Sequence, residues 1–295
     1  MTSADEGWPS PDEWRDGGRR IRLTRLGHEV FVRIDGPDEA PPVTLLHGFP
    51  SSSHDWAPVL GALTGTHRVL SIDFLGFGDS DKPAGHPYRL VEQADLVQEV
   101  WAALAFPAGG ALVVHDYAVS VAQELLARGV PSDRIAWLNG GVYPDLHRPT
   151  PGQAALAGPD GAELAALATP AMVADTLRSI LHRPVPDEIV ADLADAAARH
   201  DGLRNLHLLL DYIRERQEHY DRWVTAFEQA RIPYAFIWGR RDPVSGDHML
   251  DRIRSRFPNA EITALDDVGH YPQIEAPRET AAALTSFLAP DGKAR

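Results

Sequence analysis

The sequence contains no cysteine among its 295 residues. Disulfide bonds, thiol nucleophiles and cysteine-ligated zinc or iron–sulfur sites are therefore excluded. Basic residues are also in deficit, with 28 Lys and Arg against 42 Asp and Glu, which gives a formal net charge of −14. This sign of charge opposes binding to nucleic acid and to anionic membrane surfaces, so we expect neither partner.

Long apolar runs are missing as well, since no stretch approaches the roughly 20 residues of a membrane-spanning helix. Residues 1–14 are acidic and contain Pro9 and Pro11, without the basic and apolar regions of a signal peptide. These features predict a cytoplasmic protein. The 13 histidines show neither His-x-His-x-Asp-His nor His-Glu-x-x-His spacing, so we predict no metal site and no cofactor.

The most informative pattern lies in residues 111–126. An apolar run ends at His115 and Asp116, and apolar residues then recur at helical spacing. We expect a strand, a sharp turn and a helix. A side chain on such a turn stands clear of the sheet, beside the free N–H groups of the helix. Asp116 would hold that position, although Asp is also a common helix N-cap.

The rest of the chain predicts an α/β fold with a mainly parallel sheet flanked by helices. Two alternating strands around Gly27 suggest an antiparallel pair at one edge of the sheet. Residues 142–230 break the pattern, because they are rich in Ala and Leu, helical in period and free of convincing strands. We interpret them as an all-helical insertion into a core made of residues 1–141 and 231–295.

Three polar residues each follow a predicted strand: Asp116, Asp242 and His270. Each has an ordinary explanation, since Asp242 could start a turn before Pro243 and His270 could be a loop histidine. Together they supply a nucleophile, a carboxylate that orients a base, and the base itself.

With these motifs the chain resembles the α/β-hydrolase family, and within it the branch with an aspartate nucleophile, which includes epoxide hydrolases and haloalkane dehalogenases. The likeness runs from about Arg20 onward and rests on His47-Gly48-Phe49-Pro50, residues 73–80, His115-Asp116-Tyr117, residues 239–242, and Gly269-His270 with Glu275 and Pro277. Residues 115–128, 139–149 and 212–223 are similar to the mesoderm-specific transcript proteins and their bacterial relatives.

The resemblance implies a role for each of these residues. Asp116 corresponds to the nucleophile, His270 to the base and Asp242 to the orienting acid, and the backbone N–H groups of Phe49 and Tyr117 match the oxyanion hole. Some related enzymes place the acid after the preceding strand, at Asn139 here. A neutral amide cannot stabilise an imidazolium as a carboxylate does, so Asp242 is favoured.

The resemblance also bears on the substrate, which we expect to be a small molecule. Dehalogenases of this branch hold the halide with a Trp and commonly an Asn, where this chain has Tyr117 and Phe49, whereas His-Gly-Phe-Pro is typical of epoxide hydrolases. Epoxide opening needs an acid, which the family supplies from lid tyrosines. Tyr212 fits that position, or it only packs the insertion onto the core. Further pocket candidates, each with a structural alternative, are His47, Trp56, His115, Tyr143, His182 and Trp223.

The prediction is a cofactor-independent epoxide hydrolase, a monomer or a homodimer, with three alternatives. One is a haloalkane or haloacid dehalogenase. Another is a carboxylic-ester hydrolase, because Val114 and Ala118 replace the usual glycines of the turn and a shifted frame would make Ser120 the nucleophile. Ser120 would then lie about one turn inside the helix. The third is a non-catalytic binding protein on the same scaffold.

Overall fold

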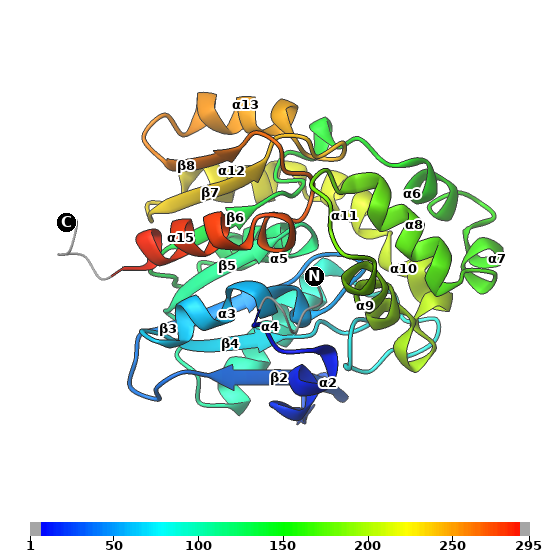
Figure 1. The fold of residues 1–295 in the computed structure, drawn as a ribbon, viewed down its shortest axis with the longest axis horizontal. Helices are drawn as coiled ribbons and strands as arrows, with labels where there is room; N and C mark the ends of the chain where they lie inside the picture. The colour runs from blue at the N-terminus through cyan, green and yellow to red at the C-terminus, as the bar shows by residue number, and fades with distance from the viewer. Residues whose placement is uncertain (1–6, 290–295) are drawn as a thin grey trace.

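A computed structural model describes residues 7–289. Its centre is an eight-stranded sheet in the order β1-β2-β4-β3-β5-β6-β7-β8 (Figure 1). The strands are Gly18–Leu23 (β1), His28–Asp35 (β2), Pro42–Leu46 (β3), Arg68–Ile72 (β4), Ala111–His115 (β5), Ile135–Leu138 (β6), Tyr234–Gly239 (β7) and Glu261–Leu265 (β8). Pairs β1–β2 and β2–β4 are antiparallel and the others are parallel. The predicted fold class and the antiparallel pair at the edge are confirmed.

From β3 onward, helices alternate with the strands of the core. They are Pro11–Asp16 (α2), Ala57–Thr64 (α3), Leu90–Ala103 (α4), Tyr117–Ala127 (α5), Pro151–Leu156 (α6), Gly161–Ala166 (α7), Pro170–Ile180 (α8), Asp187–Ala198 (α9), Leu206–Leu209 (α10), Tyr212–Glu218 (α11), Tyr220–Gln229 (α12), Asp247–Arg256 (α13), Pro272–Glu275 (α14) and Pro277–Leu288 (α15). Within the described residues there are also three short 3₁₀ helices: Ser53–Trp56 (η1), Pro144–Leu146 (η2) and Arg199–Asn205 (η3).

The sheet is buried on both faces because successive side chains of a strand point to opposite sides. In β6, Ile135 and Trp137 pack into the cluster that α4, α5, α12 and α13 cover, and Ala136 and Leu138 pack into the cluster under α3 and α15. Figure 1 shows α3 and α15 in front of the sheet. This arrangement leaves the carboxyl ends of the parallel strands as the open edge of the core.

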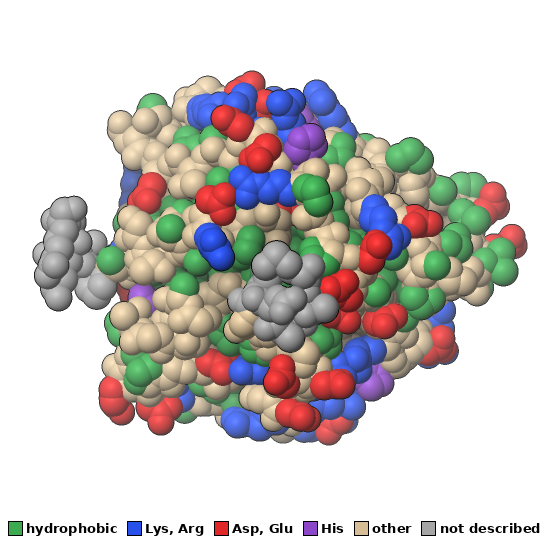
Figure 2. Space-filling view, in the orientation of Figure 1, with side chains coloured by type: hydrophobic (Ala, Val, Ile, Leu, Met, Phe, Trp, Pro, Cys, Tyr) green, Lys and Arg blue, Asp and Glu red, His purple; other side chains and the backbone are tan. Residues whose placement is uncertain are grey.

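The chain between β6 and β7 covers that edge. Residues 142–230, here called the helical segment, are all described and contain helices but no strand. In Figure 1, helices α6 to α11 gather at the right, beyond the carboxyl ends of the parallel strands. Figure 2 shows hydrophobic side chains at the surface of the helical segment. Its exposed large hydrophobic residues are Leu164, Leu167 and Met172. Among residues 7–289, no helix combines the length and the apolar character needed to cross a bilayer.

Candidate active site

Asp116 lies on the turn between β5 and α5 in a strained conformation. Its φ of 45° and ψ of −103° are unusual for any residue with a side chain. A hydrogen bond from the Asp116 N–H to the carbonyl of Asn139, over 2.9 Å, stabilises the turn. Gly140 permits this approach, since a Cβ there would come within 3.0 Å of the Asp116 backbone. The strand, turn and helix expected from the sequence are therefore present.

Loops from two distant strands bring an acid and a base to this turn. Asp242 follows β7 and His270 follows β8. Nδ1 of His270 lies 2.7 Å from Oδ2 of Asp242, and Nε2 lies 3.7 Å from Oδ1 of Asp116. All three side chains are buried. The three residues singled out from the sequence thus form one continuous chain of polar contacts.

The carboxylate of Asp242 is fully hydrogen-bonded in its buried place. Oδ2 accepts from the hydroxyl of Ser245 over 2.6 Å and from Nδ2 of Asn139 over 2.9 Å, and Oδ1 accepts from the N–H of Val244 over 2.7 Å. Oδ1 of Asn139 accepts from the N–H of Gly239, which determines the orientation of its amide. Asn139 therefore donates to the carboxylate of Asp242, and it is Asp242, not Asn139, that contacts His270.

The charges of the site shift its pKa values in opposite directions. Burial disfavours the charged form of His270, but Asp242 and Asp116 outweigh that effect and raise the pKa of His270 to about 10. Burial would raise the pKa of Asp116, but His270 and the nearby Arg216 together lower it well below the usual range. The resting site consequently favours an imidazolium between two carboxylates.

Two backbone N–H groups belong to the oxyanion-hole positions expected from the sequence. The N–H of Phe49 donates to Oδ2 of Asp116 over 3.0 Å. Tyr117 is the first residue of α5, where N–H groups are free of helical partners and the helix dipole favours negative charge. Phe49 is therefore a direct donor to the carboxylate, and Tyr117 contributes the start of the helix beside it.

A small cavity of about 40 Å³ lies between the pair Asp116 and His270 and the helical segment. Its apolar wall comes largely from α8 and the loop after β3, and its polar wall from the start of α6. The other lining residues are Phe49, Pro50, Thr150, Gln153, Val173, Thr176, Leu177, Ile180 and Val244. The volume holds a few water molecules at most, so a substrate needs the helical segment to move.

The two predicted pocket histidines near the turn are structural. His115 is fully buried, with Nε2 2.8 Å from the carbonyl of His270, and burial lowers its pKa to about 4. Nε2 of His47 accepts from the N–H of Phe74 over 3.1 Å, and burial lowers the pKa of His47 to about 3. Both rings are neutral supports of the loops that carry the site.

The other predicted pocket residues also lie outside the cavity wall. Trp56 packs in the core under α3, and Nε1 of Trp223 donates to Glu124 on α5 over 2.6 Å. The hydroxyl of Tyr143 donates to a carboxylate, Oε1 of Glu228, over 3.1 Å. His182 follows α8, and its backbone N–H donates to Oε2 of Glu275 over 2.7 Å. None of these four residues lines the cavity beside Asp116, and their part in substrate binding remains a prediction.

Arg216 on α11 is an important neighbour that the sequence pattern did not reveal. It is fully buried, and Nη2 donates to the carbonyl of Asp116 over 3.1 Å while Nε donates to the hydroxyl of Ser120 over 2.7 Å. Its guanidinium lies 4.4 Å from the ring centre of Tyr212, which is four residues earlier on the same helix. Ser120 lies inside α5, and its hydroxyl is thus hydrogen-bonded to Arg216 rather than to His270.

Tyr212 also lies near the site. Its buried ring is 5.3 Å from that of Tyr117 and 6.0 Å from that of Phe49, between ring centres. Its hydroxyl accepts a long hydrogen bond from Nε2 of Gln153 over 3.5 Å. Burial first, and then the charge of Asp116, raise the pKa of Tyr212, which keeps the phenol protonated.

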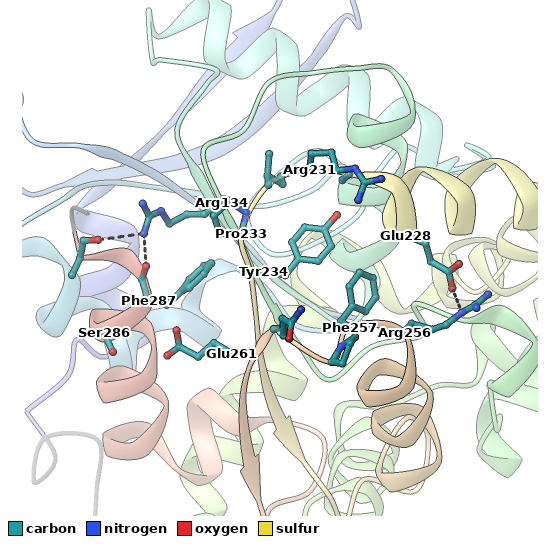
Figure 3. Close-up of a pocket in the computed structure, with 16 residues that line it drawn as sticks. Arg134, Glu228, Arg231, Pro233, Tyr234, Arg256, Phe257, Glu261, Ser286 and Phe287 are labelled. Atoms are coloured by element: carbon teal, nitrogen blue, oxygen red, sulfur yellow. Dashed lines mark hydrogen bonds and ion pairs between the residues drawn. The ribbon is translucent and has the colours of Figure 1, made fainter. Parts of the chain in front are cut away.

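A much larger hollow lies at the opposite end of the sheet. Its volume is about 740 Å³, and it lies at the amino ends of β7 and β8 (Figure 3). Figure 3 shows Tyr234 and Phe257 in its wall, with Glu228 paired to Arg256 at one side. Neither Asp116 nor His270 lines it. Within residues 7–289, no group of three or more His, Asp or Glu side chains could hold a metal ion.

Comparison with known proteins agrees with the fold. The family model described as "Alpha/beta hydrolase family" matches residues 45–283. The chain belongs to this family. This hydrolase is 40% identical over 290 residues to the putative hydrolase LipZ of Mycobacterium tuberculosis, covering 95% of this chain and 98% of the relative.

The expected likeness to the mesoderm-specific transcript proteins is confirmed. The human homolog is 34% identical over 300 residues, covering 95% of this hydrolase and 88% of the relative. Among solved structures, the haloalkane dehalogenase DbeA of Bradyrhizobium elkanii superposes with a TM-score of 0.80 at 20% identity, covering 92% of this chain and 97% of that one. At that identity the likeness supports the fold alone.

Proposed function

We propose that this hydrolase opens epoxides with water through a covalent ester on Asp116, beneath a lid formed by the helical segment. The main support for this proposal is the position of the Asp116 carboxylate. Asp116 stands on a strained turn, with the N–H of Phe49 on one oxygen and His270 beside the other. A carboxylate in this position attacks an sp³ carbon and leaves an ester that water can hydrolyse.

In the first step, the carboxylate of Asp116 attacks an epoxide carbon through Oδ1. The bond from that carbon to the ring oxygen breaks, and its electron pair remains on the oxygen. Tyr212 donates its proton there, because its phenol is protonated and contacts Gln153, which lines the cavity. The phenolate that remains is stabilised by the guanidinium of Arg216, 4.4 Å from the ring centre.

Esterification removes the charge of Asp116, one of the two carboxylates that hold the proton of His270. The pKa of His270 therefore falls in the intermediate, and its proton neutralises the phenolate of Tyr212. His270 is then a neutral base that deprotonates a water molecule as it attacks the ester carbonyl. The Phe49 N–H stabilises the resulting oxyanion, and collapse with proton transfer to the departing oxygen releases the diol and restores the carboxylate.

Donor chemistry favours an epoxide over a haloalkane. The resemblance assigns halide binding to side-chain N–H donors at the positions of Phe49 and Tyr117, and neither of these side chains has an N–H. A departing alkoxide needs a proton, which Tyr212 can supply. Tyr143, the other tyrosine considered, is bound to Glu228 and is not a donor in this reaction.

Single-turnover reaction in ¹⁸O-labelled water tests the proposal. Hydrolysis at the ester carbonyl leaves one labelled oxygen in Asp116, which peptide mass analysis detects after reaction with excess enzyme over styrene oxide. His270→Gln is the matched variant, because it should trap the unhydrolysed ester as a mass increase on the same peptide. If neither label nor adduct reaches the Asp116 peptide with any small epoxide, the proposal fails.

A further inference from the structure

Gln153 is held in a defined orientation at the start of α6. Thr150 is the N-cap of this helix, and its hydroxyl accepts from the N–H of Gln153 over 3.2 Å. In return, Oε1 of Gln153 accepts from the N–H of Thr150 over 2.9 Å. This reciprocal pair is a capping box, which begins the helix and fixes the side chain of its third residue.

The capping box decides which way the amide of Gln153 faces. A backbone N–H can only donate, so the amide oxygen must be the atom that faces Thr150. The NH₂ group therefore points away from the cap, toward the hydroxyl of Tyr212 3.5 Å away. Gln153 also lines the cavity that contains Asp116 and His270.

We propose that Gln153 is a second donor to the epoxide oxygen, acting with Tyr212. This inference rests on the proposed function. One N–H of the amide approaches the phenol oxygen, so the phenol accepts there and its own proton remains free for the substrate. The other N–H is available to the same oxygen atom of the substrate. Two donors thus act on the same leaving oxygen.

The arrangement specifies the class of leaving group. When the carbon–oxygen bond of the epoxide breaks, the electron pair stays on an oxygen that remains attached to the product. Gln153 keeps its proton and donates a hydrogen bond to this developing alkoxide, while Tyr212 transfers its proton. An alkoxide needs the proton of Tyr212 and a halide does not, so the substrate is a strained cyclic ether small enough for the cavity after the lid moves.

Two variants distinguish hydrogen-bond donation by Gln153 from its role in the capping box. Gln153→Glu keeps an oxygen for the N–H of Thr150, because Glu serves in a capping box as well as Gln, but it has no N–H to donate. Gln153→Met keeps the size of the side chain and removes the amide without adding charge. Ala154→Gly is the control, since glycine at this exposed position weakens α6 and the residue does not line the cavity.

The experiment measures ester formation by rapid quench with styrene oxide, in the His270→Gln background in which the ester accumulates. Both Gln153 variants should form the ester about 100-fold more slowly, the loss typical for one donor to a developing oxyanion. Ala154→Gly should keep the rate of the His270→Gln parent. In enzymes that retain His270, hydrolysis of a preformed ester should be unchanged by either Gln153 variant.

The inference is overturned if both Gln153 variants form the ester at the parent rate, or if Ala154→Gly slows it as much as they do. A His270→Gln parent that forms no ester with any epoxide is a different result. It refutes the proposed function, and the role of Gln153 falls with it.

Discussion

The backbone N–H of Phe49 donates to Oδ2 of Asp116 over 3.0 Å, so the two carboxylate oxygens are not equivalent. Oδ2 already occupies the place that the carbonyl oxygen of an ester would take, next to an oxyanion donor. Oδ1, 3.7 Å from Nε2 of His270, accepts no hydrogen bond from Phe49 and is the oxygen left for attack. The same donor therefore orients the nucleophile in the first step and stabilises the oxyanion in the second.

Asp116→Asn should abolish turnover, with a loss of about 10⁴-fold or more in kcat, the scale seen when a member of a catalytic triad is removed. Asn has nearly the same shape and tolerates positive φ, so the turn should keep its conformation. Steady-state kinetics with styrene oxide measure the loss, and thermal unfolding checks the fold. A variant that stays folded and active would exclude a carboxylate nucleophile.

Ser120→Ala should keep the activity, because the Ser120 hydroxyl is bound to Arg216 and not to His270. Its removal leaves the buried Nε of Arg216 without this acceptor, so we expect a loss of about 1 to 3 kcal/mol in the free energy of unfolding. Activity on nitrophenyl esters and epoxides, together with urea unfolding, gives both quantities. If Ser120→Ala abolishes ester hydrolysis and Asp116→Asn spares it, the nucleophile is the serine.

Asn139→Ala should reduce kcat without changing the identity of the acid. Nδ2 of Asn139 donates to Oδ2 of Asp242, the atom that also faces His270. Without this donor the carboxylate is less well held, so the loss should be far smaller than the roughly 10⁴-fold expected for Asp242→Asn. Parallel kinetics of the two variants make the comparison. Equal losses would show that Asn139 does more than hold Asp242.

The sequence predicted the features that depend on local pattern. The change of period at Asp116 marked a strand, a turn and a helix, and all three are present. The pocket wall depends instead on how the helical segment folds back over the sheet. Apolar spacing shows which face of a helix is buried, but not which surface it meets. For this reason Trp223 was assigned to the pocket although it packs on α5.

Two residues of the site could have been found from short-range signals. Thr150 and Gln153 have the spacing of a capping box, which implies a fixed amide at the start of a helix. Arg216 follows Tyr212 by four residues, and side chains at that spacing meet on one face of a helix. Neither signal shows that these helix faces point toward Asp116. Gln153 and Arg216 lie about 40 and 100 positions away from Asp116 in the sequence, so their proximity depends on the tertiary fold.

The charge of His270 should make the stability of the protein depend on pH in a specific direction. The pKa of His270 is raised to about 10, from an ordinary value of 6.5, so the folded protein keeps a proton that the unfolded chain releases between these limits. The stabilisation is complete below about pH 6.5. Above it, this group alone should lower the free energy of unfolding by about 1.4 kcal/mol per pH unit until about pH 10.

His270→Gln lacks this titration, and groups such as Lys82 that titrate in the same range are present in both proteins. We therefore expect urea unfolding at pH 7, 8 and 9 to show a free energy of unfolding that falls more steeply with pH in the wild type than in His270→Gln. A difference in stability between them that is constant over this range would mean that His270 is neutral in the resting site, and that it needs no change of charge on Asp116 to act as a base.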